Sequence, residues 1–278
     1  MKTEVIMSIR SDYHLHSHHS GDSDAPMEEM VKSGIAAGLE AMCFTEHVDF
    51  DFRPLGKEQS DLFELNADSY LYELLSLKKK YEDQIELLFG LECGMQPHTA
   101  KENVRFIKEH EYDFVIASVH LCGGMDPYYP EYFEGKEEEA ALREYLEETF
   151  RNIKVFGNFD CLGHLDYIIR YCKKMDRQYE YAKYKDIIDK ILSYLIDREK
   201  ALELNTAGVR KGMKEMNPCR DVMRRYHEMG GELITIGSDA HRPEEVASGF
   251  DRAEELLKDC GFQYYTVYNG RIAMMKKL

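Results

Sequence analysis

The sequence has 278 residues, a length that suits one α/β barrel or roughly two smaller domains of about 150 residues. Hydrophobic residues make up 44% and aromatic residues 12% of the chain, a composition that argues against a disordered, collagen-like or coiled-coil protein. The formal net charge of −16 argues against a nucleic-acid binder, because such proteins present a Lys/Arg surface. A small phosphorylated substrate stays compatible with this charge, because metal ions or arginines can reverse its sign inside one pocket.

The cysteines and the first residues indicate a cellular compartment. There are seven cysteines, an odd number without a CxxC pair, which favours reduced thiols in a cytoplasmic protein. The chain starts with a run too short and too charged for a signal peptide. No apolar stretch approaches the length of about 20 residues that spans a membrane. We therefore expect a cytoplasmic protein with neither a membrane nor a nucleic-acid partner, and the oligomeric state stays open.

Apolar, β-branched runs alternate with helical patterns along the chain. The predicted strands are Ser8–His16, Ala41–His47, Ile85–Cys93, Phe114–His120, Cys161–Asp166, Ala201–Thr206 and Leu233–His241. The predicted helices are Met27–Gly38, Ser69–Asp83, Thr99–Glu109, Glu137–Phe156, Tyr184–Glu199, Pro218–Gly230 and Pro243–Cys260. This alternation implies a parallel sheet, and the lack of a flexible linker favours one closed barrel. We expect a single α/β domain over residues 1–278, with Tyr264–Lys277 as a last strand or hairpin.

Metal-binding or polar side chains stand at the carboxyl end of every predicted strand. In an α/β barrel these ends face one shared mouth, where active sites lie. Positions i and i+2 of an extended strand point to the same face, so His14 with His16, and Asp239 with His241, can each bind one ion. Imidazole and carboxylate ligands suit Zn²⁺, Fe²⁺ and Mn²⁺. Four more such side chains, at other strand ends, predict more than one metal ion: His47, Glu92, His120 and His164.

From Asp12 to His241 the chain resembles the polymerase-and-histidinol-phosphatase (PHP) superfamily. The matching segments, in order, are His14-Leu15-His16, Thr45-Glu46-His47, Gly90-Leu91-Glu92, Ser118-Val119-His120, Gly163-His164-Leu165-Asp166 and Gly237-Ser238-Asp239-Ala240-His241. One departure is Leu165, where many relatives have proline, but the neighbouring imidazole is kept. The resemblance implies a distorted, TIM-like (β/α)7 barrel, in agreement with the seven predicted strands.

The resemblance also implies three divalent metal ions, which are Zn, Fe or Mn. The ligand six residues after His16 is Asp22, with Asp24 as the alternative. Asp12, Glu46 and Asp166 flank ligands, and either orient them or serve as ordinary caps and solvent-facing acids. The implied ligand sets are His14, His16, Glu92 and Asp239 for the first ion, Asp22, His47 and His241 for the second, and Glu92, His120 and His164 for the third.

Within the superfamily, the length and layout are most similar to the monofunctional histidinol phosphatases. Arg170 and Arg210 follow strand ends and resemble the phosphate-binding arginines of those enzymes, and a guanidinium fork suits a phosphate dianion. The resemblance implies hydrolysis of L-histidinol phosphate in histidine biosynthesis, with a metal-bridging hydroxide attacking phosphorus. Asp239 or His241 is the nearest candidate to protonate the leaving alkoxide.

Two other functions stay open at this level. The same site would serve a PHP-type phosphoesterase that acts on nucleotides or other small phosphoesters. A non-catalytic metal-binding protein is the third hypothesis, although the full ligand set argues against it. The long segment Leu121–Gly135, with Tyr128, Tyr129, Glu131 and Tyr132, is predicted to be a lid over the mouth or a packed loop.

Overall fold

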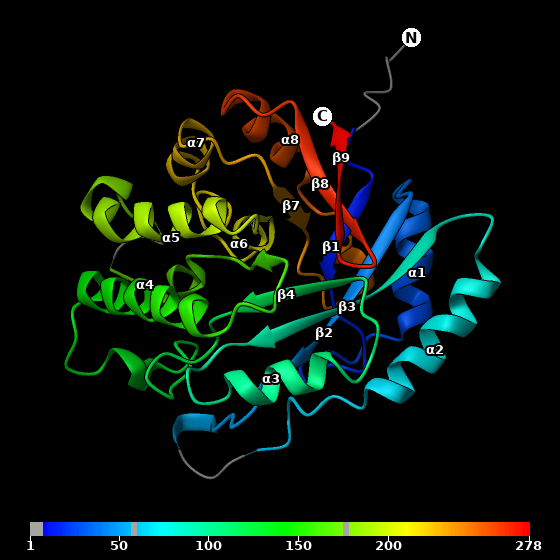
Figure 1. The fold of residues 1–278 in the computed structure, drawn as a ribbon, viewed down its shortest axis with the longest axis horizontal. Helices are drawn as coiled ribbons and strands as arrows, with labels where there is room; N and C mark the ends of the chain where they lie inside the picture. Colours follow the sequence, from blue (N-terminus) through cyan, green and yellow to red (C-terminus); the bar gives the residue numbers. More distant parts are fainter. Residues whose placement is uncertain (1–7, 57–59, 175–177) are drawn as a thin grey trace.

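The computed structural model describes residues 8–56, 60–174 and 178–278, where seven parallel strands form one sheet that curls into a nearly closed barrel (Figure 1). The strands lie side by side in the order in which they follow one another along the chain. They are β1 (Ser11–Leu15), β2 (Ala41–Val48), β3 (Glu86–Gly94), β4 (Phe114–Ser118), β5 (Cys161–Leu162), β6 (Ala201–Asn205) and β7 (Ile234–Gly237).

Helices connect the strands and surround the barrel (Figure 1). The α-helices are α1 (Met27–Ala36), α2 (Ala67–Lys80), α3 (Ala100–Ile107), α4 (Glu138–Val155), α5 (Lys185–Asp197), α6 (Ala207–Arg210), α7 (Arg220–Glu228) and α8 (Phe250–Asp259). The 3₁₀ turns are η1 (Pro54–Gly56), η2 (Pro130–Phe133), η3 (Tyr167–Tyr171), η4 (Tyr181–Lys183) and η5 (Pro243–Glu245). Within the described residues, none of these helices has the length and apolar character needed to cross a membrane.

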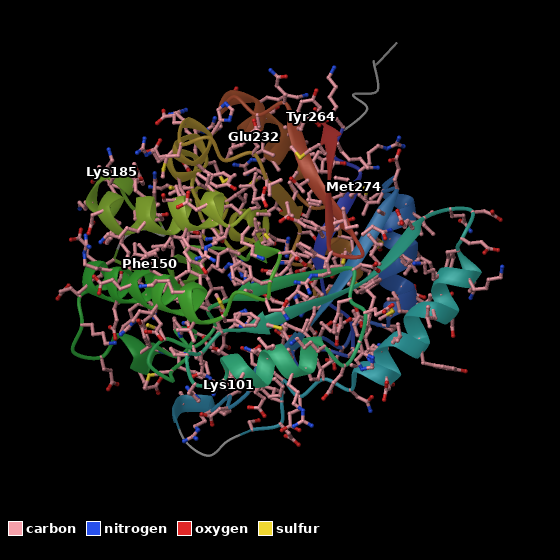
Figure 2. All side chains as sticks on the ribbon, viewed as in Figure 1. Lys101, Phe150, Lys185, Glu232, Tyr264 and Met274 are labelled. Atoms are coloured by element: carbon pink, nitrogen blue, oxygen red, sulfur yellow. The ribbon has the colours of Figure 1, made fainter. Side chains whose placement is uncertain are left out.

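The strands are buried on both faces, which is why their sequences read as continuous apolar runs. All residues of β2 and all but the first of β3 are buried. The interior side chains of the strands and the apolar faces of the outer helices form one core, and side chains fill the space between these layers (Figure 2). The predicted TIM-like barrel with seven strands is therefore confirmed.

The barrel is closed between its first and last strands, β1 and β7, just beyond their carboxyl ends. The amide of His16 donates to the carbonyl of Ala240 over 2.9 Å, and the amide of Asp239 donates to the carbonyl of His14 over 2.7 Å. These bonds join the first and last predicted metal-binding segments directly. Residues that are more than two hundred positions apart in sequence thus meet at one seam.

The segment predicted as a last strand or hairpin is an antiparallel hairpin, β8 (Tyr264–Asn269) with β9 (Ile272–Lys277). Figure 2 labels Tyr264 on β8 and Met274 on β9. The hydroxyl of Tyr13 in β1 donates to the carbonyl of Tyr268 over 2.7 Å, and the amide of Gly270 donates to Asp113 just before β4. The hairpin therefore covers the amino ends of the strands, opposite the mouth.

The predicted helix Pro243–Cys260 differs from the structure, which has the short turn η5, a break, and then α8 from Phe250. Gly249 has a φ of 81°, a left-handed conformation that interrupts a helix. The carboxylate of Asp12 accepts a hydrogen bond from the amide of Ala247, and the hydroxyl of Thr206 donates to the carbonyl of Ser248. These bonds hold the break against the ends of β1 and β6.

Candidate metal centre

The carboxyl ends of the strands bring the predicted ligands into one cluster. His14 lies in β1 and His47 near the end of β2, whereas His120 and His164 follow β4 and β5 by two residues. Glu92 comes from β3, and the segment after β7 supplies the last two ligands. The nine residues named from sequence, which the structure brings together, are His14, His16, Asp22, His47, Glu92, His120, His164, Asp239 and His241.

The carboxylate of Glu92 is the centre of the cluster, and three imidazoles face one of its oxygens. Oε2 lies 3.0 Å from Nε2 of His14, 3.2 Å from Nδ1 of His47 and 3.4 Å from Nε2 of His16. The backbone of β3 is buried beside β2 and β4, and the Glu92 side chain is completely buried. One carboxylate oxygen therefore stands at the meeting point of two strands and the loop that follows β1.

The other oxygen of Glu92 faces the opposite side of the barrel mouth. Oε1 lies 3.2 Å from Nε2 of His120 and 3.0 Å from Nε2 of His164, and it accepts a hydrogen bond of 2.6 Å from the Ser118 hydroxyl. Burial alone would raise the pKa of Glu92, but the positive charges of His14 and other histidines hold that pKa well below its usual range. Glu92 is thus placed to bridge two groups of imidazoles.

A second group forms at the rim, where Asp22 meets His47 and His241. Oδ2 of Asp22 lies 3.0 Å from Nε2 of His241 and 3.6 Å from Nε2 of His47. The ring of His16 stacks on both of these histidines, with centroids 4.3 and 4.4 Å away. Burial and these neighbouring rings lower the pKa of His16 well below its usual value, so the structure favours the neutral, metal-binding form of this imidazole.

Asp239 joins the two groups. Its Oδ1 lies 3.6 Å from Nδ1 of His241 and 3.8 Å from Nε2 of His16. The residue has a φ of 52°, and β7 already ends at Gly237. Asp239 and His241 were expected to share one face because both would lie in an extended strand. This reason is wrong, since the strand ends before either residue. The two side chains converge because the chain turns at Asp239.

Two acids that were not singled out from sequence hold the ligands in place. Oε1 of Glu203 lies 2.5 Å from Nδ1 of His14, and Oε2 accepts the backbone amide of His164 over 2.7 Å. Oδ1 of Asp49 lies 2.8 Å from Nδ1 of His120. Carboxylates of this kind fix the tautomer and the direction of a metal-binding imidazole. Two features of the sequence could have pointed to these acids. Glu203 is a charged residue inside the predicted apolar strand Ala201–Thr206, and Asp49 is an acid two residues after His47.

The three acids expected to flank the ligands organise the loops around them. Asp12 accepts from the amides of His14, Ser238 and Ala247. The carboxylate of Glu46 accepts from two serines in the loop after β1, and that of Asp166 accepts from Asn217. They therefore position the segments that carry ligands, which is the orienting role that the sequence left open.

The chemistry of the donor set fits metal ions. Groups of three donors converge within 4.8 Å, for example His14 with His16 and Glu92, and His16 with His47 and His241. Nε2 of His16 and Nδ1 of His47 are buried and have no hydrogen-bond partner among the described residues. Unpaired buried nitrogens are costly in an apolar surrounding, and mixed imidazole and carboxylate donors match borderline divalent metals. The residues therefore fit a site for more than one ion.

A cavity of about 410 Å³ opens above the cluster. Arg170 lines it, with Nη1 2.8 Å from Oδ2 of Asp239, and with Asn205 and Asn217 accepting hydrogen bonds from its other nitrogens. This buried guanidinium and the neighbouring Lys211 are cationic parts of the lining. The cavity can therefore take an anionic group directly against the cluster.

Arg210 precedes the lining residue Lys211 but does not itself line the cavity. Its Nη2 donates to the carbonyls of Ser238 and Asp239 over 3.1 and 3.0 Å, and its Nε lies 3.4 Å from Oε1 of Glu245. Its Nη1 is buried and has no hydrogen-bond partner among the described residues. Arg210 thus supports the turn that carries Asp239 and retains one donor for a further contact.

The segment predicted as a lid divides into two parts. Tyr128 and Tyr129 line the cavity together with Asp126, an acid that was not singled out from sequence. Tyr132 is buried in the core, and Glu131 is exposed and outside the cavity lining. The first part therefore covers the mouth, and the second part packs as a loop against the barrel.

Comparison with known proteins gives consistent results along the chain. The PHP domain family matches residues 12–207. The histidinol-phosphatase of Lactococcus lactis is 36% identical over 93% of this chain and 94% of its own length. A probable histidinol-phosphatase of Clostridium acetobutylicum is 31% identical over 91% of this chain and 94% of its own.

A solved structure matches almost the whole fold. The crystal structure of histidinol phosphate phosphatase from Lactococcus lactis aligns with a TM-score of 0.85 and 34% identity. The alignment covers 95% of this chain and 98% of that protein. That crystal structure contains zinc, L-histidinol and phosphate. The similarity therefore extends over almost the whole length of both chains.

Proposed function

The chain belongs to the PHP domain family, and from this membership we propose that it hydrolyses L-histidinol phosphate to L-histidinol and phosphate. The observation that carries the proposal is the carboxylate of Glu92, surrounded by imidazoles at the floor of a cavity that Arg170 also lines. The relative that is 34% identical binds zinc, L-histidinol and phosphate, which are the metal and the two products of this reaction.

We assign the nine predicted ligands to three divalent ions, Zn, Fe or Mn. These ions would supply Lewis-acid stabilisation of the phosphoryl oxygens and a water of lowered pKa. The chain contributes the charge balance around them. Asp22, Glu92 and Asp239 together carry three negative charges, so a site with three divalent cations has a net positive charge. Such a surplus favours a phosphate dianion in an otherwise acidic protein.

The arginines are the proposed phosphate-binding residues. Arg170 is held by Asp239, Asn205 and Asn217, so its guanidinium needs little reorganisation when a phosphoryl group arrives, and preorganised donors are effective where charge develops. The buried and unpaired Nη1 of Arg210 supports the same role for this residue. The leaving alkoxide needs a proton, and Asp239 and His241, which both line the cavity, stay the proposed donors. Asp239 is ionised beside Arg170, so it would first have to take up the proton that the attacking water loses.

We propose that residues 1–278 form one domain, because the hairpin at the end of the chain covers the base of the barrel. The net charge of −16 supports a small phosphate ester rather than nucleic acid as the partner. Seven free cysteines support a reducing compartment, the cytoplasm.

The test is phosphate release by metal-loaded protein from L-histidinol phosphate, a mononucleotide and phenyl phosphate. We expect kcat/KM for L-histidinol phosphate to exceed the other two by at least about 100-fold, equivalent to about 2.7 kcal/mol. The Glu92→Gln variant, purified in the same way, excludes a contaminating phosphatase if it is inactive. Equal and low efficiency on all three esters would contradict this substrate and favour a general phosphoesterase. Bound metal without any turnover would favour the non-catalytic hypothesis.

A further inference from the structure

A second group of metal-binding side chains lies outside the cavity, where the loop after β1 meets helix α2. His18 and His19 stand in this loop, and Glu73 lies in α2. Their donor atoms all lie within 4.8 Å of one another, and none of these three residues belongs to the cavity lining. The group therefore shares no residue with the metal centre.

Both imidazoles face the same carboxylate oxygen of Glu73. Its Oε2 lies 2.9 Å from Nε2 of His19 and 3.4 Å from Nε2 of His18. Zinc lies about 2.0–2.2 Å from nitrogen and oxygen ligands, so two ligand atoms of a tetrahedral site are about 3.4 Å apart. The longer contact exceeds the usual length of a hydrogen bond but matches this separation. The three atoms are thus spaced like ligands around one ion.

The fold holds both rings in defined positions. The amide of His18 donates to the carbonyl of Ala25 over 2.8 Å, which closes the loop on itself. The rings of His18 and His19 have centroids 4.5 Å apart, and His19 also packs against Tyr70 of α2, with 5.6 Å between centroids. Donors that are already gathered lose little freedom when they bind a ligand, so an ion could bind without rearrangement of the loop.

The chemistry of the three donors suits a divalent cation. Two neutral imidazoles and one carboxylate carry a single negative charge, and mixed nitrogen and oxygen donors match borderline ions such as Zn²⁺. Three protein ligands leave one tetrahedral position for water. The side chains of His18 and Glu73 are 43% and 33% exposed, so an ion from solvent can reach them.

We propose that His18, His19 and Glu73 form an additional metal site, which binds one Zn²⁺ ion or another borderline divalent cation. The proposal does not depend on the reaction proposed above. The site joins α2 to the loop between His16 and Asp22, two predicted ligands of the metal centre. An ion bound there fastens this loop to the helix from outside the cavity.

The test is zinc binding by the full-length protein, measured by equilibrium dialysis at increasing concentrations of free Zn²⁺. Zinc that remains after dialysis against zinc-free buffer is counted separately, as tightly bound metal. Above this amount, we expect the unaltered protein to take up one equivalent per chain that Glu73→Gln and His18→Gln bind at least about tenfold more weakly, because each variant loses a direct ligand. The tightly bound zinc should be equal in all three proteins.

Asp68→Asn is the matched control, because Asp68 is an exposed acid of the same helix and lies 3.6 Å from one histidine, His110. It should bind zinc like the unaltered protein, and an equal loss in this variant would mean that surface acids in general bind the ion. Equal uptake by Glu73→Gln and the unaltered protein overturns the site. A loss of tightly bound zinc in Glu73→Gln overturns it too, because the residue would then support the metal centre.

The position of the ion can be determined directly. In crystals soaked with Zn²⁺, anomalous scattering at the zinc edge should show an ion between His18, His19 and Glu73. The same peak should be lost in crystals of Glu73→Gln. Soaked crystals of the unaltered protein without a peak between these three side chains would refute the proposal.

Discussion

Glu203 on β6 and His14 on β1 are joined by a short contact, with Oε1 of the acid 2.5 Å from Nδ1 of the imidazole. The other oxygen of Glu203 accepts the amide of His164 over 2.7 Å. One carboxylate that is not itself a predicted ligand therefore fixes two of the nine. Burial lowers the pKa of His14, but the charges of Glu203 and Glu92 outweigh this and raise it well above its usual value.

Substitution of Glu203 should weaken metal binding without unfolding the barrel. Glu203→Gln keeps the size of the side chain but removes the charge that orients His14. Outer partners of metal-binding histidines contribute about 10–100-fold in affinity or activity, and we expect a loss of that size. Metal content after dialysis and phosphate release would be measured together. Glu139→Gln, an exposed acid on α4, is the control, and equal behaviour of the two variants would contradict the orienting role.

Gly237 at the end of β7 leaves the space in which this contact forms. A Cβ atom there would lie 2.2 Å from Cβ of His14 and 2.6 Å from Oε1 of Glu203. Gly237→Ala should cost about 1–3 kcal/mol by overpacking, a fall of several degrees in Tm, and should also lower metal content. Gly157→Ala is the control, because a Cβ atom at that position would have nothing within 4 Å. Similar Tm values for both variants would refute this close packing.

Much of the site could be predicted because its ligands interrupt apolar strands. His14, His47 and Glu92 stand inside or just after buried runs, where an unpaired polar side chain is costly, and the parallel barrel then brings the strand ends together. The start of the last helix was predicted less well, because the helix expected from Pro243 begins only at Phe250. The break at Gly249 depends on a left-handed φ and on bonds to distant residues, and local sequence carries neither.

The supporting residues could not be predicted for a different reason. Glu203 and Asp49 act through contacts with histidines from other strands, so their positions in the sequence mark them as unusual acids but do not show which ligand each one holds. Arg210 is the last residue of α6, and Lys211 follows it directly as the C-cap. Which of the two faces the cavity depends on how α6 packs, and the structure places Lys211 in the lining.

Asp22, and not the neighbouring Asp24, is placed to bind a metal ion at the rim of the site. Asp22 lines the cavity and contacts His241 and His47 at 3.0 and 3.6 Å, whereas Asp24 lies outside the cavity lining. Asp22→Asn should lower bound metal by about one equivalent per chain and reduce turnover, because a neutral amide is a poorer ligand than a carboxylate. Metal analysis would decide, with Asp24→Asn as the matched control. A loss of metal in Asp24→Asn alone would reverse the assignment.

The phosphate-binding role of the two arginines can be tested with a product. Inorganic phosphate should inhibit the enzyme, and both Arg170→Lys and Arg210→Lys should raise its inhibition constant at least about tenfold, since lysine cannot reproduce a bidentate guanidinium contact. Arg220→Lys, in an exposed ion pair with Asp259, should have no effect. An unchanged constant in Arg210→Lys would mean that Arg210 acts only by holding the turn at Asp239.

Glu28 offers a pH-dependent contribution to stability that is remote from the metal centre. Its carboxylate on α1 accepts hydrogen bonds of 2.7 Å from Lys80 and from the Tyr81 hydroxyl, at the end of α2. These bonds, first the one from Lys80, lower the pKa of Glu28 from 4.5 to about 2. A carboxyl whose pKa is lower in the folded state stabilises that state above its unfolded pKa, and the effect disappears as the pH falls through the folded value.

Glu28→Gln should therefore lower Tm slightly at pH 7, by about 1–2 °C, because the pair is exposed and screened by solvent. The difference from the unaltered protein should shrink as the pH falls from about 4.5 towards 2, and thermal unfolding at several pH values would measure it. Glu29→Gln is the control, since Glu29 pairs only with Lys32 of its own helix in the described part of the chain. A difference that stays constant with pH would show that the charge of Glu28 does not link α1 to α2.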